Sequence, residues 1–96
     1  MNSCELIGVV RRIEKDDTNN QFLVLEVNRP YLDNSQSFQY DYIKIYRWGI
    51  MGVGSFSDIV EGMQLAIRGH LINMNDETIV VSEFLKVLYY PKNIVV

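Results

Sequence analysis

The sequence predicts an all-β fold, a five-stranded Greek-key barrel with a short helix between its third and fourth strands. Two observations lead to this prediction. Five segments rich in β-branched and aromatic residues follow one another, separated by clusters of Asp, Asn, Ser and Gly. One brief helix signal stands after the third segment. At 96 residues the chain is long enough for one core, so a single domain over residues 1–96 is expected.

The expected strands cover residues 4–14, 21–28, 38–49, 64–72 and 78–88. Gly8 in the first and Gly69 in the fourth stand where a bulge or bend would help a barrel to close. Pro30 is expected to end the second strand. Aliphatic side chains at alternate positions form the expected core. They are Leu6, Val9 or Val10, Ile13, Leu23, Leu25, Val27, Ile43, Ile45, Leu65, Ile67 and Leu71.

The helix is expected over residues 56–61. Ser55, followed three residues later by Asp58, resembles a capping box, and Gly62 stands where a helix would stop. Strands and helix in this order are those of an OB-fold. A small β-sandwich and an SH3-like barrel are the alternatives, and the position of the helix and the glycines within long strands favour the OB-fold.

The third strand, FQYDYIKIYRWG, has two unlike faces. Ile43 and Ile45 share one face with Arg47, which is expected to pair with an acid at the end of the barrel. The other face carries Phe38, Tyr40, Tyr42, Lys44, Tyr46 and Trp48. Because a core takes the aliphatic residues, the rings and the lysine are expected outside. Such a face can bind a ligand or contact another subunit, and the strand alone does not decide between the two.

Composition limits the possible functions. The net charge of −3 argues against indiscriminate nucleic-acid binding but allows a local basic site. One cysteine, Cys4, and one histidine, His70, are too few for a zinc site, so no enzyme activity, metal or cofactor is expected. The sequence shows neither a secretion signal nor an apolar run long enough to cross a membrane, and a single cysteine forms no internal disulfide. A cytoplasmic protein is expected.

Five stretches of the chain resemble the single-stranded DNA-binding proteins of bacteria and phages. They are MNSCELIG, VNRPY at 27–31, YIKIYRWG at 42–49, DIVEGMQLAIRGHL at 58–71 and VVSEFLKVL at 80–88. The resemblance covers essentially the whole chain. It implies an OB-fold that binds single-stranded DNA without sequence preference, in DNA replication, repair or recombination. It also implies a bacterial cell as the setting, with the gene belonging to the cell, a phage or a plasmid.

The resemblance assigns roles to single positions. Tyr42 and Trp48 fall on positions where bases stack, and Tyr31 matches a further one. Lys44 falls on the basic position between the first two, and Arg29 precedes Tyr31, so both are expected to meet phosphates. Tyr46 shares the face of the third strand. The expected DNA-binding set is therefore Arg29, Tyr31, Tyr42, Lys44, Tyr46 and Trp48.

The chain departs from this family in three places. The position after the third strand, often lysine in the family, is Ile50 or Met51. The hairpin INMNDET at 72–78 is short and acidic, where the family commonly has a long basic hairpin with another stacking ring. The chain also stops without the family's flexible linker and acidic tip, so recruitment of partners by a tail is not expected.

A homo-oligomer is expected from the resemblance. Family members usually form tetramers, whereas the short primosomal relatives are dimers that bind DNA and protein. The alternative function is an OB-fold accessory subunit whose aromatic face contacts protein. The interleaved charges at Arg11, Arg12 and Lys15 are either paired among neighbouring acids or placed at the rim of a phosphate site.

Overall fold

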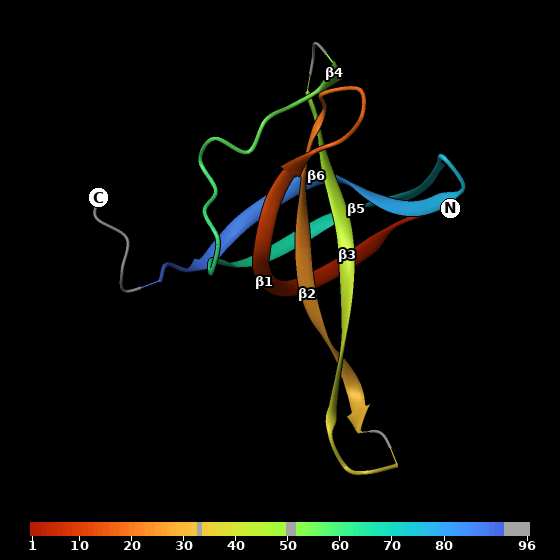
Figure 1. Cartoon of the computed structure of the whole chain (residues 1–96), viewed down its shortest axis with the longest axis vertical. Helices are drawn as coiled ribbons and strands as arrows, with labels where there is room; N and C mark the ends of the chain where they lie inside the picture. Colours follow the sequence, from red (N-terminus) through yellow and green to blue (C-terminus); the bar gives the residue numbers. More distant parts are fainter. Residues whose placement is uncertain (33, 50–51, 92–96) are drawn as a thin grey trace.

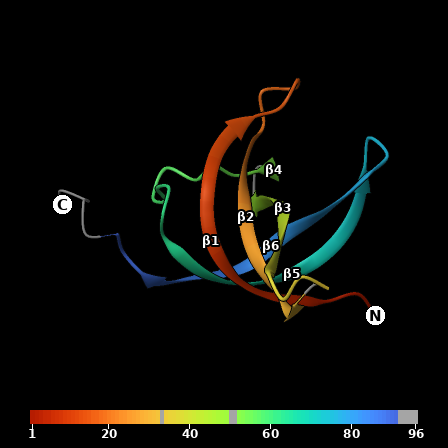
Figure 2. The same cartoon turned by 60° about the horizontal axis from the view of Figure 1, so that its bottom comes forward.

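Five long strands curl into a closed barrel (Figures 1 and 2). The computed structural model describes residues 1–32, 34–49 and 52–91, with the backbone alone at 31, 32, 48, 49, 52 and 53. Its strands are β1 (Cys4–Lys15), β2 (Gln21–Leu32), β3 (Phe38–Gly49), β4 (Gly52–Val53), β5 (Gln64–Met74) and β6 (Glu77–Tyr89). The predicted all-β fold is confirmed, and the five long strands are those expected from the sequence.

Strand pairing closes the barrel in the OB-fold manner. β1 pairs antiparallel with both β2 and β5, β2 pairs antiparallel with β3, and β5 pairs antiparallel with β6. The parallel pairing of β3 with β6 completes the circuit. The two-residue β4 adds only a short hairpin to the end of β3.

β1 bends from one half of the barrel to the other next to Gly8. Residues up to Val9 pair with β5, and residues from Val9 onward pair with β2. A Cβ atom on Gly8 would lie 2.4 Å from the carbonyl oxygen of Glu26, so only glycine allows β1 to pass this close to β2. The predicted bend is therefore confirmed, and a register shift follows between Val10 and Arg12.

The second predicted irregularity lies opposite Gly69. The register shifts between Arg68 and Gly69 because β6 carries one extra residue, with Arg68 facing Phe84 and Gly69 facing Ser82. A Cβ atom at position 69 would meet the carbonyl oxygen of Val81 at 1.9 Å. The bulge thus falls on β6, and the glycine of β5 makes room for it.

The barrel interior is the expected aliphatic core. Its buried residues are Val10, Leu23, Leu25, Ile45, Phe56, Ile59, Met63, Leu65, Ile67 and Val80. The prediction for Leu71 was wrong, because its side chain is exposed where the β5–β6 hairpin runs on past the bulge. A second buried cluster, Phe22, Val24, Tyr46 and Ile79, lies apart from this core.

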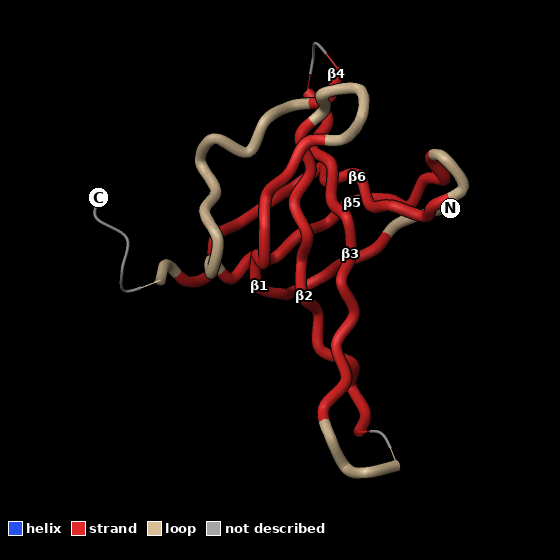
Figure 3. Tube along the Cα trace, in the orientation of Figure 1, coloured by secondary structure: helices blue, strands red, loops and turns tan. Residues whose placement is uncertain are grey.

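The predicted helix at 56–61 is absent from the described residues, which contain strands and loops only (Figure 3). A six-residue helix gains too few hydrogen bonds to offset the cost of nucleation. The backbone and side chains of residues 56–61 form hydrogen bonds with distant strands instead. The Phe56 N–H donates to Oε1 of Gln21 at 2.5 Å, and only one turn-like bond forms within the segment, from Ile59 N–H to the Phe56 carbonyl at 3.0 Å.

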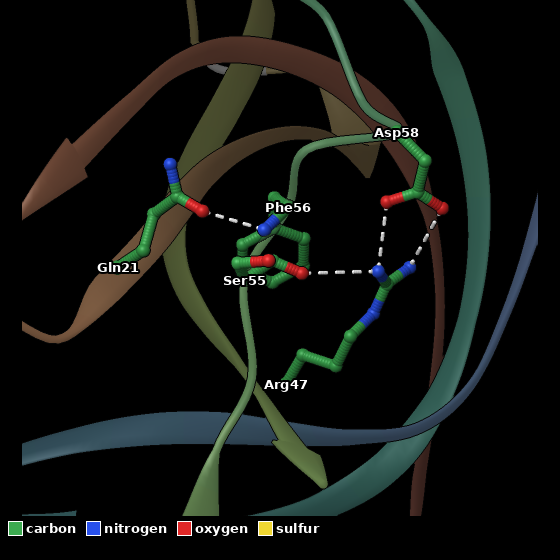
Figure 4. A network of polar contacts seen from close by, with 5 residues as sticks. All are labelled: Gln21, Arg47, Ser55, Phe56 and Asp58. Atoms are coloured by element: carbon green, nitrogen blue, oxygen red, sulfur yellow. Dashed lines mark hydrogen bonds and ion pairs between the residues drawn. The ribbon is translucent and has the colours of Figure 1, made fainter.

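Asp58, the expected partner in a capping box, binds Arg47 of β3 (Figure 4). The Arg47 guanidinium donates to the Asp58 carboxylate at 2.8 Å and to the Ser55 carbonyl at 3.1 Å, and it lies 5.0 Å from the centre of the Phe56 ring. The prediction that Arg47 pairs with an acid at the barrel end is confirmed. This network fixes the position of Phe56, whose side chain is buried in the core.

β2 does not end at Pro30, as the sequence suggested, but continues to Leu32. Between Asn28 and Leu32 the pairing with β3 is irregular. Pro30 lies in this stretch, so its lack of an N–H group interrupts no regular series of hydrogen bonds between the two strands. Since β1 pairs with β2 only as far as Glu26, whose partner on β3 is Tyr42, residues 27–32 and 38–41 continue beyond the barrel as a two-stranded arm, seen at the bottom of Figure 1. We call this segment the β2–β3 arm.

Candidate nucleic-acid interface

On the outer face of β2 and β3, the side chains become less exposed from the beginning of β3 toward its end. Tyr40, Tyr42 and Lys44 lie opposite Asn28, Glu26 and Val24 of β2. The rings of Phe38 and Tyr40 on the arm, and of Tyr42 where the arm meets the barrel, are exposed. Further along the barrel, Lys44 is partly covered and Tyr46 is buried. The face therefore begins as a row of exposed rings and ends in a hollow.

Tyr42 is anchored at its tip and exposed along its ring. Its hydroxyl donates to Oε1 of Glu26 at 3.0 Å, and this bond raises the pKa of the Tyr42 hydroxyl. Glu26 is itself buried and forms an ion pair with Arg11. With 60% of Tyr42 accessible, the ring is oriented but free to accept a flat partner.

Lys44 stands two positions further along β3, as expected for the basic residue of the face. Its Nζ lies 3.0 Å from the Glu77 carboxylate and 5.0 Å from the centre of the Phe22 ring. A phosphate at this position would have to replace Glu77 as the partner of the ammonium group.

Tyr46 is only 3% exposed and offers no ring face to a ligand. Its ring packs on Phe22 at a centroid distance of 5.6 Å, and its hydroxyl donates to Asp16 at 2.9 Å. Burial and this bond to a carboxylate raise the pKa of Tyr46 to about 12. Tyr46 is thus part of the support beneath the face.

The buried ring of Tyr46 helps to line a hollow of about 300 Å³. The hollow lies between the β1–β2 loop and the tip of the β5–β6 hairpin, and these two loops border the oligonucleotide-binding face in OB-folds. Its residues are Lys15, Asp16, Asp17, Thr18, Phe22, Lys44, Tyr46, Met74, Asn75 and Glu77.

Arg29 does not join this face. Its guanidinium binds both carboxylate oxygens of Asp41, the shortest contact being 2.8 Å, and lowers the pKa of that carboxyl. Alternation along β3 places Asp41 on the opposite side of the strand from Tyr40 and Tyr42. The expected phosphate contact of Arg29 is thus replaced by an ion pair across the other side of the arm.

Tyr31 and Trp48 belong to β2 and β3, but their side chains lie outside the described part of the structure. Trp48 pairs through its backbone with Val53 of β4. Both residues remain expectations from the sequence.

Two features of the face were not assigned a role from the sequence. Phe38 and Tyr40 are 65% and 42% exposed on the arm, beside Tyr42. Their alternation with polar residues placed them on the outer face, but only the course of the arm beyond the barrel reveals how open they are. The contacts of buried Glu26 with Tyr42 and Arg11 join three strands, β1, β2 and β3, and leave no signal in the local sequence pattern.

Most basic side chains near this face are paired with carboxylates. Arg12 binds Glu14 at 2.9 Å, which agrees with the self-paired alternative for that residue. The other pairs are Arg11–Glu26, Arg29–Asp41, Lys44–Glu77 and Arg47–Asp58. On the face itself, Lys44 is paired with Glu77 and Arg11 with Glu26, so an anionic ligand has to exchange partners with these carboxylates.

The described residues contain no group of three or more His, Cys, Asp or Glu side chains able to hold a metal ion. The Nδ1 atom of His70 lies 2.5 Å from the Glu83 carboxylate, and burial raises the pKa of the Cys4 thiol. Within the same residues, no helix is long and apolar enough to cross a membrane.

Comparison with known proteins gives likeness in structure but not in sequence. No protein-family model and no curated protein matches the chain. A small single-stranded DNA-binding protein of Mycoplasma pneumoniae superposes with a TM-score of 0.64 at 17% identity, over 99% of both chains.

Two further structures resemble the chain. The dimeric N-terminal domain of PriB from Thermoanaerobacter tencongensis has a TM-score of 0.52 at 18% identity, over 93% of this chain and 98% of that one. Rim1, a mitochondrial single-stranded DNA-binding protein of S. cerevisiae, has a TM-score of 0.55 at 11% identity, over 95% and 97%. At such identities the likeness concerns the fold, and the chain shares the OB-fold of these structures.

Proposed function

We propose that this protein binds single-stranded DNA without sequence preference, on the outer face of β2 and β3. The observation that carries the proposal is the exposed, tethered ring of Tyr42, two positions from Lys44 on the same face of the barrel. A single strand exposes the flat surfaces of its bases, and stacking on an aromatic ring contributes about 1–3 kcal/mol per base. A lysine beside the ring suits the phosphate that follows.

Tyr42 and Lys44 form the centre of the proposed site. Tyr31 and Trp48 extend it at the positions that the family resemblance assigns to stacking. Tyr46 supports the face from below, and Arg29 holds Asp41 across the arm. Because stacking accepts any base, the site suits a protein that coats exposed strands in DNA replication, repair or recombination.

The protein is further proposed to act as a homodimer or homotetramer. In the described residues, β1 pairs with β2 only from Val9 onward, so the edge of β1 between Cys4 and Gly8 has β5 on one side alone. Ile7 of this stretch and Phe84 of β6 are exposed, and unpaired edges with apolar neighbours favour association.

A protein-binding accessory subunit is the second candidate. The pairing of Lys44 with Glu77 and of Arg11 with Glu26 favours it, because an aromatic face whose cations are already paired also suits a protein surface.

The experiment is a titration with oligo-dT that follows the fluorescence of Trp48, the single tryptophan, at two salt concentrations. Quenching that weakens as salt rises indicates a ring stacked on bases beside neutralised phosphates. No change in fluorescence, together with no binding by anisotropy of labelled DNA at low salt, would refute the proposal and favour the protein-binding function.

A further inference from the structure

The β2–β3 arm carries aromatic rings that the barrel does not need. Phe38, Tyr40 and Tyr42 occupy alternate positions of β3 and share one face. Phe38 and Tyr40 belong to neither of the two buried clusters, and both are largely open to solvent. Large exposed rings in a contiguous row mark a surface that meets a partner.

The other side of the arm holds the two strands together. Arg29 of β2 and Asp41 of β3 form a two-pronged ion pair there, across the ribbon from the rings. Such a pair fixes the planar guanidinium in one geometry. The rings are therefore presented by a braced ribbon rather than by a loop, with Tyr42 tied to the barrel through Glu26.

The spacing of the row suits an unstacked strand. Side chains on one face of a strand repeat about every 6.8 Å, whereas bases stacked in a duplex strand repeat about every 3.4 Å. One base on each ring thus requires a strand stretched to about twice its stacked length. Single-stranded DNA can reach this length, whereas a base-paired duplex cannot without unstacking.

We propose that Phe38 and Tyr40 extend the DNA-binding face along the arm and receive two further bases of the same strand. The inference rests on the proposed function and adds a subsite to it. The row continues without a break from Tyr42, which favours the same ligand for all three rings. Across from Tyr40, the exposed amide of Asn28 can bond to the edge of a base.

The test compares the wild type with the double variant Phe38→Ala/Tyr40→Ala on oligo-dT of increasing length, by anisotropy of labelled DNA. Short oligonucleotides that fill only the barrel face should bind both proteins equally. On longer ones the wild type gains affinity from two more nucleotides, and the double variant should lack this gain, binding at least about thirtyfold more weakly if each ring contributes about 1 kcal/mol or more. Tyr90→Ala, at a ring as exposed as Tyr42 but beyond β6, is the matched control and should bind like the wild type.

The outcomes separate this inference from the proposed function. If the wild type binds and the double variant equals it at every length, the arm has no subsite, although the proposed function stands. Equal weakening on short and long oligonucleotides also contradicts an added subsite, as does dissociation of the oligomer by the double substitution. If the wild type binds no oligo-dT at all, both proposals fail. Both rings are exposed, so the variant should fold, which circular dichroism checks.

Discussion

The substitution Glu77→Gln tests whether carboxylates on the proposed face restrain DNA binding. It removes the charge that Lys44 meets at 3.0 Å and keeps the shape of the side chain. With 37% of the lysine and 50% of the glutamate side chain exposed, the pair contributes at most about 1 kcal/mol to folding. The variant should therefore fold, with a free energy of unfolding within about 1 kcal/mol of the wild type.

The effect on binding follows from the exchange of partners. In the wild type, a phosphate that takes Lys44 must displace Glu77, which costs up to the free energy of the pair. Without this cost the affinity for oligo-dT should rise by up to about fivefold, the equivalent of 1 kcal/mol. A displaced carboxylate also takes up a salt cation, so its removal should steepen the dependence of log K on log salt, by at most about 0.7 for one single-strand contact.

The matched control is Glu61→Gln. Glu61 is exposed in the connection between β4 and β5, and none of the described residues forms an ion pair with it. Both substitutions remove one negative charge, so a general effect of net charge would appear in both. Anisotropy titrations at three salt concentrations give the affinities and the slopes. Equal changes in the two variants, or no change in Glu77→Gln, would refute the exchange of partners at Lys44.

Three further predictions concern stability. Gly69→Ala places a Cβ atom 1.9 Å from a carbonyl oxygen of β6, so the free energy of unfolding measured in urea should fall by on the order of 3 kcal/mol. In the control Gly54→Ala the nearest contact of the added Cβ atom is 3.4 Å, and the free energy of unfolding should fall by less than about 1 kcal/mol. Arg47 lowers the pKa of Asp58, so the stability from this pair is present above the ordinary carboxyl pKa and is lost as pH falls through the lowered value. Arg47→Met should remove that part of the acid dependence, measured by unfolding from pH 7 to pH 3. The pKa of Tyr46 is raised to about 12 in the folded state. The stability that its protonated hydroxyl contributes should therefore be complete below about pH 10 and be lost as pH rises toward 12. Unfolding curves between pH 8 and pH 11.5 should show this loss in the wild type but not in Tyr46→Phe.

The sequence predicted the strands and the core because both depend on local alternation. Leu23, Leu25 and Ile45 lie inside as their spacing indicated, and Gly69 marks the bulge between β5 and β6. Leu71 has the same spacing but is exposed, because the inward face of a strand is covered only while the strand stays in the barrel.

The errors arise where distant residues decide the local structure. Asp58 was read as part of a helix start, but Arg47 from β3 takes its carboxylate. Tyr46 was placed on the binding face, but Asp16 from the β1–β2 loop and Phe22 from β2 bury it. Arg29 was expected to meet phosphate, but Asp41 binds it across the arm. In each case the deciding partner is at least 11 residues away in the sequence.

The central claim is that single-stranded DNA lies on the outer face of β2 and β3. Photo-crosslinking with an oligonucleotide that carries 5-iodouracil, followed by mass spectrometry of the attached peptides, tests it most directly. We expect crosslinks at Tyr42 and at the neighbouring rings of β3. In the variants Tyr42→Ala and Trp48→Ala, we expect the crosslinks to β3 to be lost. Crosslinks confined to the end of β6, around Phe84 and Tyr89, would contradict the proposed interface.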